Sequence, residues 1–467
     1  MKFYNFNIAR LKYFFIIILF SIFTILTPVY SISSSESEEE KKYFKIFKRV
    51  YQKLRDEYIE KKSPKELFIG AIDGMIKSLN DPHTAFLKPQ QREELQIETK
   101  GEYGGLGIVI GIRDNKLTVI SPIEDTPAER AGIQPGDKII KINGEEVKDP
   151  KLNEIVKVLR GKPGTKVTIS IERENVDELI DYTLIRETIK LKPVKFAVIK
   201  TNIGYIKIIS FNKNAPKELK KAIKNLKKKN IKGLIIDIRN NPGGLLDVAE
   251  KIVDFFISKG LIVYTRTRKG IFNPFLNQDY YAHREKTLIP DDMPLVVLIN
   301  HGSASASEIF AGAIQDHKRG ILVGVKSFGK GSVQSVIDLD DGYGLRYTTA
   351  LYYTPNGRQI NKKGIEPDIK VEQIKLSKRE IKDIKKIENK GYIKKFLKEH
   401  PNYTPKDIDI LIKNLNNDDI YLDKIIIKKL IKNEKYKKKK APLCDLDTDL
   451  QLKMGIQIIL MQIKNRS

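Results

Sequence analysis

The spacing of hydrophobic positions changes several times along the chain, and each change marks an expected structural unit. Apolar residues at intervals of three and four, such as Phe47, Val50 and Leu54 in a run that starts at Phe44, are typical of amphipathic helices. Later, short apolar runs alternate with Gly/Pro turns, which indicates strands, and then strands alternate with helical stretches. The pattern predicts a multidomain α+β and α/β protein with a leading segment at 1–31, a helical region at 38–96, a β-rich module at 97–187, an α/β core at 190–375 and a helical, lysine-rich tail at 376–467.

The first thirty or so residues have the pattern of a targeting segment. Lys2, Arg10 and Lys12 form a basic start, and the apolar run from Tyr13 to about Leu26 is too short to span a bilayer comfortably. We expect residues 1–31 to be a signal peptide, with an uncleaved membrane anchor as the alternative. In either case we expect an exported protein, in the periplasm or anchored to the membrane and facing it.

The net charge and the cysteine and histidine content bear on which partners, metals and cofactors the protein binds. The formal net charge of +26 favours a polyanionic partner, but acidic residues are interleaved with the basic ones and no nucleic-acid-binding signature accompanies the charge. A nucleic-acid partner is therefore not expected, whereas binding to an anionic membrane surface stays open. Cys444 is a single cysteine and cannot form an intrachain disulfide, and the histidines lack metal-ligand spacing, so we expect no metal and no cofactor.

The β-rich module opens with a glycine loop, Gly104-Gly105-Leu106-Gly107-Ile108, followed by an apolar strand. Free N–H groups in such a loop can hold a carboxylate, and the strand offers an edge to an extended peptide. With Thr126-Pro127-Ala128 and Gly136-Asp137-Lys138 further on, residues 97–187 closely resemble a PDZ domain. The resemblance implies capture of a free polypeptide C-terminus, with carboxylate-binding amides from Leu106, Gly107 and Ile108. Arg160, at the end of the groove helix, is either a ligand sensor or simply a solvent-exposed helix end.

A second motif combines a strand, a tight turn and a helix. The apolar run Pro294–Ile299 leads into Gly302-Ser303-Ala304-Ser305-Ala306-Ser307-Glu308 and then into a helical pattern. A serine at a helix N-terminus lies beside free amides that stabilise developing negative charge. Alternatively, Ser305 and Glu308 form only an S-x-x-E capping box. The local sequence does not choose among the three alternating serines.

A lysine between glycines follows, in Phe328-Gly329-Lys330-Gly331-Ser332-Val333-Gln334. A lysine in an apolar site loses its proton more easily, and the neutral amine can then accept a proton from a serine hydroxyl. Gln334 shares the Lys330 side of an extended chain and can orient the amine.

Three other interpretations of these segments have weak support. The phosphate-loop pattern G-x-x-x-x-G-K lacks the Ser or Thr that should follow Lys330, and the S-x-x-K pattern needs a helix that the glycines disfavour. A Ser-His-Asp triad would have to use His301 or His317, where any polar residue would serve as well.

A strand followed by a double glycine supplies candidate oxyanion donors. The apolar run Leu234–Ile238 leads through Arg239 into Asn240-Asn241-Pro242-Gly243-Gly244. Glycines at a strand end can aim backbone amides at an oxyanion, although a plain strand-to-helix turn explains them equally well.

Taken together, residues 40–371 resemble the carboxy-terminal processing (tail-specific) serine proteases, because these motifs occur in the family's order and are followed by Tyr352-Tyr353-Thr354-Pro355-Asn356-Gly357-Arg358. The resemblance implies a serine endopeptidase acting on protein substrates with apolar C-termini. It leaves open an adaptor protein, membrane association and a homo-oligomer. It assigns the nucleophile to Ser305, the base to Lys330, its orientation to Gln334, the oxyanion amides to Ala306 and to Gly243 or Gly244, and a supporting role to Asp316.

Two alternative functions, neither of them enzymatic, compete with the protease interpretation. A binding protein could combine a PDZ module with a degenerate protease core, but Ser305, Lys330 and Gln334 are all intact. A basic nucleic-acid binder would show salt-dependent affinity that survives removal of residues 377–467.

Overall fold

The computed structural model describes residues 37–466 apart from 114, 175, 201, 272–276, 375 and 438–441. The expected targeting segment at 1–31 lies outside these residues. Contacts divide the chain into two compact units, Met1–Ser78 and Leu79–Ser467. In the described part of the chain, we find no helix that combines the length and apolar character needed to cross a membrane.

The described residues of the first unit form the helices α2 (Glu38–Glu57) and α3 (Pro64–Lys77). Each begins at a capping box, formed by Ser37 with Glu40 and by Ser63 with Glu66, which satisfies free amides of the first turn. The helices touch through aromatic rings, with the Tyr51 and Phe68 centroids 4.6 Å apart. The helical pattern expected here is therefore present.

The β-rich module is a six-stranded antiparallel sheet with two helices and its own hydrophobic core. Its core includes Leu117, Val119, Ile139 and Ile169, which lie on alternate positions of neighbouring strands. A separate pair of strands, β2 (Glu102–Gly105) and β9 (Glu187–Lys190), joins the two ends of the module. The elements of the module are β3 (Ile108–Arg113), β4 (Lys116–Pro122), α5 (Pro127–Arg130), β5 (Lys138–Ile142), β6 (Glu145–Glu146), α6 (Leu152–Leu159), β7 (Lys166–Glu172) and β8 (Ile180–Ile185).

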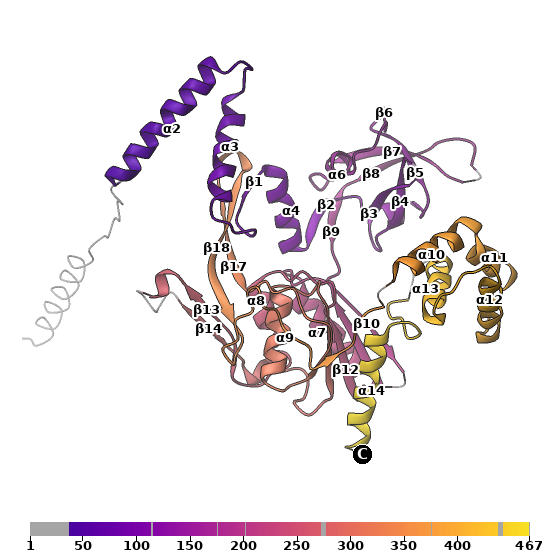
Figure 1. The fold of residues 1–467 in the computed structure, drawn as a ribbon. Coiled ribbons are helices and arrows are strands. Elements are labelled where there is room, and N and C mark those ends of the chain that lie inside the picture. The colour runs from indigo at the N-terminus through magenta and orange to yellow at the C-terminus, as the bar shows by residue number, and fades with distance from the viewer. Residues whose placement is uncertain are drawn as a thin grey trace, which may run out of the picture. The chain divides into compact units, whose positions relative to one another are not determined.

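The α/β core is built on a six-stranded sheet that is parallel except at one edge (Figure 1). Its strand order is β10-β11-β12-β15-β16-β19, and only β10 and β11 are antiparallel. Parallel strands are covered on both faces, which explains why their sequences are nearly continuous apolar runs. The strands are β10 (Val194–Ile199), β11 (Ile203–Ile208), β12 (Gly233–Asp237), β15 (Leu295–Ile299), β16 (Ile321–Gly324) and β19 (Ile369–Lys370).

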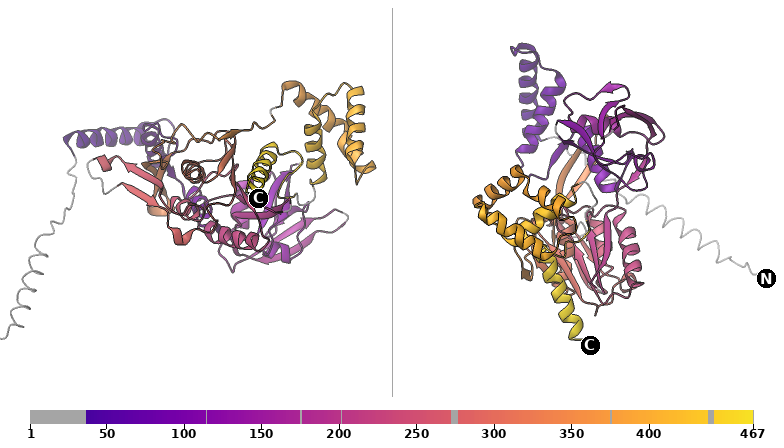
Figure 2. Two further views of the ribbon diagram at one scale, coloured as in Figure 1. Left: turned by 90° about the horizontal axis from the view of Figure 1, so that it is seen from below. Right: turned by 90° about the vertical axis from the view of Figure 1, so that its right-hand side faces the viewer.

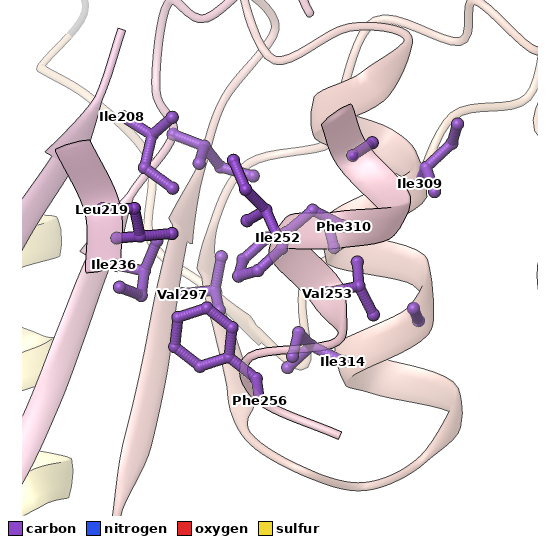
Figure 3. Packing of buried hydrophobic residues seen from close by; sticks show 14 of the residues in the cluster. Ile208, Leu219, Ile236, Ile252, Val253, Phe256, Val297, Ile309, Phe310 and Ile314 are labelled. Carbon is purple, nitrogen blue, oxygen red and sulfur yellow. The ribbon is translucent and has the colours of Figure 1, made fainter. Parts of the chain in front are cut away.

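Alternate strand residues supply the two faces of this sheet. Ile236 and Val297 pack against α7 (Ala215–Lys227), α8 (Leu246–Val253) and α9 (Ala306–Asp316), as Figure 3 shows. Phe256 and Phe310 meet edge to face in this layer, with ring centroids 5.4 Å apart. The opposite face, including Val296, is covered by α14 (Leu450–Lys464). A helix from the end of the chain thus completes the core.

A five-stranded antiparallel sheet carries the lysine motif. Its central strand β18 (Gly344–Tyr353) pairs with β17 (Ser332–Asp338) on one side and with β1 (Ala85–Leu87) and β13 (Leu261–Thr267) on the other. Strand β14 (Gln278–Tyr281) extends the sheet beyond β13. Helix α4 (Pro89–Lys100) follows β1 in the chain.

The remaining helices, α10 (Lys378–Lys390), α11 (Tyr392–Glu399), α12 (Pro405–Asn417) and α13 (Lys424–Lys435), pack around a hydrophobic core of their own. They lie together in both views of Figure 2. The expected multidomain α+β fold is confirmed, with the PDZ-like module, the α/β core and helical segments in the predicted order.

Candidate active site

The serine motif forms the turn between β15 and α9. Ser305 is the residue before the helix and has φ 55° and ψ −116°, a conformation that L-residues rarely adopt. Helix α9 is almost entirely buried from Ala306 to Ile314. A strained residue is therefore held at the N-terminus of a buried helix, beside the amides of its first turn.

The three alternating serines have different surroundings. Ser303 and Ser307 are fully buried, and their hydroxyls donate to the carbonyls of Ile238 and Asn241 at 2.8 and 2.9 Å. Ser305 is only partly buried. Ser303 and Ser307 therefore hold the turn against the neighbouring loop, and geometry singles out the serine that sequence alone did not.

Ser305 and Glu308 do have the arrangement of a capping box, but the hydroxyl makes no cap hydrogen bond. The N–H of Ser305 donates to the Glu308 carboxylate at 2.9 Å, and the N–H of Glu308 donates to the carbonyl of Ser305 at 2.7 Å. The capping interpretation therefore does not occupy the Ser305 hydroxyl, because the cap is formed through main-chain N–H groups.

Glu308 connects the serine turn to the lysine segment. Its side chain is fully buried and accepts the N–H groups of Gly329 and Lys330 at 2.7 and 2.8 Å and the Ser327 hydroxyl at 2.6 Å, besides the N–H of Ser305. Burial raises the pKa of this carboxyl, and the hydrogen bonds oppose the increase. Sequence reasoning assigned Glu308 only to a helix cap, and nothing local could reveal its contacts across the chain.

Lys330 is half-buried and lies two residues before β17 begins. Burial lowers the pKa of its amine, and the positive charge of Arg346 lowers it further, while the carboxylates of Asp81 and Glu308 act in the opposite direction. Within the described chain, the amine makes no hydrogen bond or ion pair, so the contact with Ser305 that a role as base would require is not formed in this structure. Catalytic hydrogen bonds often close only when substrate binds.

Tyr352, from β18, lies between the two segments. Its phenol donates to the carbonyl of Lys330 and also interacts with the Ser305 side chain. Complete burial raises the pKa of the phenol well above its usual value, so the group stays protonated. The family motif drew attention to this tyrosine in sequence but gave it no role.

Gln334 does not contact the Lys330 amine in this structure. Its amide nitrogen donates to the hydroxyls of Ser332 at 2.8 Å and Thr348 at 3.4 Å. Thr348 donates in turn to Asp81 at 2.6 Å. Sequence reasoning gave Asp81 no role in the site, because no spacing rule connects it with β18.

The candidate oxyanion donors come from two loops that nearly touch. A Cβ on Gly243 would lie 2.8 Å from the Ser305 Cβ and 2.9 Å from the Ala306 nitrogen. The N–H of Gly243 already donates to the Asn241 side chain at 2.9 Å. Counting only partners among the described residues, the N–H groups of Gly244 and Ala306 have no hydrogen bond, so these two amides are free to bind an oxyanion.

Asp316 and the histidines lie elsewhere. Asp316, at the end of α9, pairs with Arg358 and accepts the N–H of Asn356 at 2.8 Å, which anchors the loop after β18. His317 forms a hydrogen bond with the Leu261 carbonyl at 2.7 Å, and His301 is exposed. None of these contacts brings a histidine to Ser305.

In the PDZ-like module, the glycine loop is tightly fixed. The carbonyls of Leu106 and Gly107 accept the N–H groups of Ala128 and Ile123 at 3.0 and 2.7 Å, and Gly107 has φ 76°. Arg160 follows the last residue of α6, and its guanidinium lies 4.8 Å from the centre of the Tyr103 ring. These contacts hold both the loop and Arg160 in place.

One group of side chains has the composition of a metal site. Ligand atoms of Glu250, Asp254 and His283 lie within 4.8 Å of one another. The buried Asp254 already contacts His283 at 3.0 Å and the Lys286 ammonium at 3.1 Å. Lys286 therefore supplies the positive charge that a metal would bring.

Comparison with known families divides the chain in the same order as its motifs. Residues 26–90 match the activating protease CtpB N-terminal domain, residues 118–173 match a PDZ domain and residues 202–371 match peptidase family S41. The core match includes the serine, lysine and double-glycine segments.

Curated relatives agree with these families. A carboxy-terminal-processing protease of Bartonella bacilliformis is 44% identical over 331 residues, which cover 70% of this chain and 74% of that protein. Carboxy-terminal processing protease CtpA of Bacillus subtilis is 38% identical over 324 residues, or 69% of this chain and 68% of that protein. A solved photosystem II D1 C-terminal processing protease is 32% identical and covers 70% of this chain and 86% of its own, with a TM-score of 0.41, too low to compare the arrangements. The chain belongs to the carboxy-terminal processing proteases of peptidase family S41, and is a serine peptidase with a PDZ domain.

Proposed function

We propose that Ser305 is the nucleophile and Lys330 the general base, with Gln334 orienting the amine. The observation that carries this assignment is the difference among the three serines. Ser303 and Ser307 use their hydroxyls to support the turn, whereas Ser305 is strained, partly exposed and free of a cap hydrogen bond. The lowered pKa of Lys330 supports the role of base, because more of the amine is neutral at a given pH.

The reaction is an acyl transfer in two halves. The neutral Lys330 amine takes the proton of the Ser305 hydroxyl while the oxygen attacks the peptide carbonyl. The tetrahedral oxyanion is bound by the N–H groups of Ala306 and Gly244, with Gly243 close behind. Collapse expels the amine product, which takes the proton from Lys330. Water then gives a proton to Lys330 and attacks the ester, and the released Ser305 oxygen regains a proton.

Substrate selection is assigned to the PDZ domain. The N–H groups of Leu106, Gly107 and Ile108 bind the terminal carboxylate of an apolar tail, and the tail extends along β3. Arg160 adjoins this loop through Tyr103 and reports occupancy to the protease core. Tail binding favours the arrangement in which Lys330 reaches Ser305.

Export of the protein is a separate proposal. The basic start and the short apolar run of residues 1–31 support it. Fusing alkaline phosphatase after residue 40 tests it: the fusion is active if the segment directs export and inactive if the segment does not.

The central experiment uses the purified protein and its Ser305→Ala variant with a loosely folded substrate that carries an apolar C-terminal tail. We expect wild type alone to degrade the substrate, and amidation of the tail carboxylate to slow the reaction. If both proteins degrade the substrate, Ser305 is not the nucleophile. An intact substrate with both proteins, while the tail peptide still binds, supports a binding protein instead.

A further inference from the structure

A cluster of polar side chains next to Lys330 is not used by the mechanism above. At its centre, Asp81 accepts hydrogen bonds from the hydroxyls of Thr84 and Thr348 at 2.6 Å each and from the N–H of His83 at 3.0 Å. These bonds engage both carboxylate oxygens. A carboxylate held by three donors keeps its charge and its position.

The cluster ties three strands together. Thr348 lies on β18 opposite Gln334 of β17, and its hydroxyl is 2.6 Å from Asp81 and 3.4 Å from the Gln334 amide nitrogen. On the other side of β18, Arg346 pairs with Ala85 of β1 and donates to the His83 carbonyl at 3.1 Å. The segment from Asp81 to β1 is therefore fixed to the strand that adjoins Gln334.

Titratable groups from three parts of the chain influence the Lys330 amine electrostatically. The segment before β1 contributes Asp81 and His83, β18 contributes Arg346, and α9 contributes Glu308. The buried Tyr352 phenol lies nearby but stays neutral. Of the two carboxylates, Glu308 is occupied by main-chain N–H groups and the Ser327 hydroxyl, whereas Asp81 is bound to the strand that supports Gln334.

We propose that Asp81 is a positioning residue for the base, because through the Thr348 hydroxyl it fixes the Gln334 side chain. The Asp81 carboxylate also favours the protonated form of Lys330. The inference rests on the proposed role of Lys330. Arg346 acts on the same amine with the opposite sign, so the pair sets the pH at which the amine becomes free.

The test is the pH profile of kcat/KM for a tailed substrate. Removal of the Asp81 charge in Asp81→Asn moves the acidic limb to lower pH, because the ammonium loses a stabilising carboxylate. Removal of the opposing charge in Arg346→Gln moves the limb to higher pH. Asp340→Asn, at the exposed turn of the same hairpin, leaves the limb unchanged. An unmoved limb in Asp81→Asn, or shifts of the same sign in both variants, overturns the proposal.

A second variant separates position from charge and remains usable if Asp81→Asn fails to fold. Thr348→Val keeps the carboxylate but removes the hydroxyl link, so kcat falls about tenfold with the acidic limb unmoved, and Thr348→Ser restores kcat. A wild-type kcat in Thr348→Val overturns the proposal that Asp81 positions Gln334 through the Thr348 hydroxyl.

The variant Lys330→Ala distinguishes an error in the proposed base from an error in the proposed role of Asp81. If this variant keeps its activity, the proposed base is wrong and the inference falls with it. If it is inactive while Asp81→Asn has the wild-type profile, only the role of Asp81 is wrong.

Discussion

Glu308 illustrates how a single residue can join two distant segments. Its buried carboxylate binds the N–H groups of Ser305, Gly329 and Lys330, so the main chain at the proposed nucleophile and at the proposed base shares one anchor. A buried carboxyl is costly unless its oxygens are fully hydrogen-bonded, and here they are. The relative position of the two segments therefore depends on this side chain.

Replacing Glu308 by Gln tests this dependence. The amide has one acceptor oxygen instead of two, so at least one main-chain N–H loses its partner. We expect kcat to fall about a hundredfold and the free energy of unfolding to fall by about 2 kcal/mol. Steady-state kinetics and thermal unfolding measure both effects. The exposed Glu285→Gln is the control, and equal kinetics for the two variants would contradict the role of Glu308.

At the scale of elements, the site depends on two loops that approach without side chains between them. Gly243 has φ 101°, and a Cβ there would lie 2.6 Å from the Ala304 carbonyl. The glycine therefore provides both a left-handed conformation and the space for the serine turn. The same reasoning applies to the PDZ domain, where a Cβ on Gly107 would lie 2.3 Å from the Thr126 Cβ.

Alanine at Gly243 should disable chemistry rather than binding. The added methyl pushes the oxyanion loop away from Ser305, so kcat falls about a hundredfold while the affinity for a tail peptide is unchanged. Rates and peptide binding measured on the same protein check this. A weaker affinity for the tail peptide with unchanged kcat would contradict the role of Gly243 in chemistry.

Alanine at Gly107 should have the opposite signature. Distortion of the carboxylate loop raises KM for tailed substrates about tenfold, and an amidated tail, which already lacks the carboxylate, is less affected. The matched control is Gly132→Ala, because that glycine also has positive φ but a Cβ there would meet open space. Equal losses for free and amidated tails would show that Gly107 does not act through the carboxylate.

At the scale of the whole chain, the α/β core depends on helix α14, which lies near the C-terminus of the sequence. Arg239, which begins the loop of the proposed oxyanion donors, binds both carboxylate oxygens of Asp449 at 2.9 and 2.7 Å across 210 residues of sequence. It also pairs with the buried Asp237, and Gln451 accepts a further hydrogen bond from it at 3.0 Å. Helix α14 thus covers the sheet and fixes the start of the loop that carries Gly243 and Gly244.

Asp449→Asn tests this long-range contact. The loss of the ion pair should lower the free energy of unfolding by about 2 kcal/mol, below the cost of breaking a fully buried pair, because the Asp449 side chain is 20% exposed. We expect kcat to fall with little change in KM. Denaturant unfolding and steady-state kinetics check this, and wild-type values for both would contradict it.

The sequence was informative wherever a function depends on local pattern. Apolar runs identified the buried strands, glycines identified the close turns, and the order of motifs identified the family. The strand-turn-helix at Ser305 and the groove helix ending beside Arg160 lie where the pattern indicated.

What the sequence could not reveal are contacts between distant segments. Asp81, Thr348 and Gln334 meet only because β1 and β17 flank β18, and Asp449 meets Arg239 only because α14 covers the sheet. Likewise, the choice among the three serines needed the carbonyls of Ile238 and Asn241 from another loop. Tertiary packing, not residue type, decides these roles.

The most direct test is the rate at which a serine-reactive fluorophosphonate labels the protein between pH 6 and 9, with the labelled residue located by peptide mapping. We predict labelling at Ser305, at a rate that rises with pH as Lys330 loses its proton and that is lost in Lys330→Ala. Labelling at Ser303 or Ser307, or a rate that is flat with pH while the protein stays folded, would contradict the account.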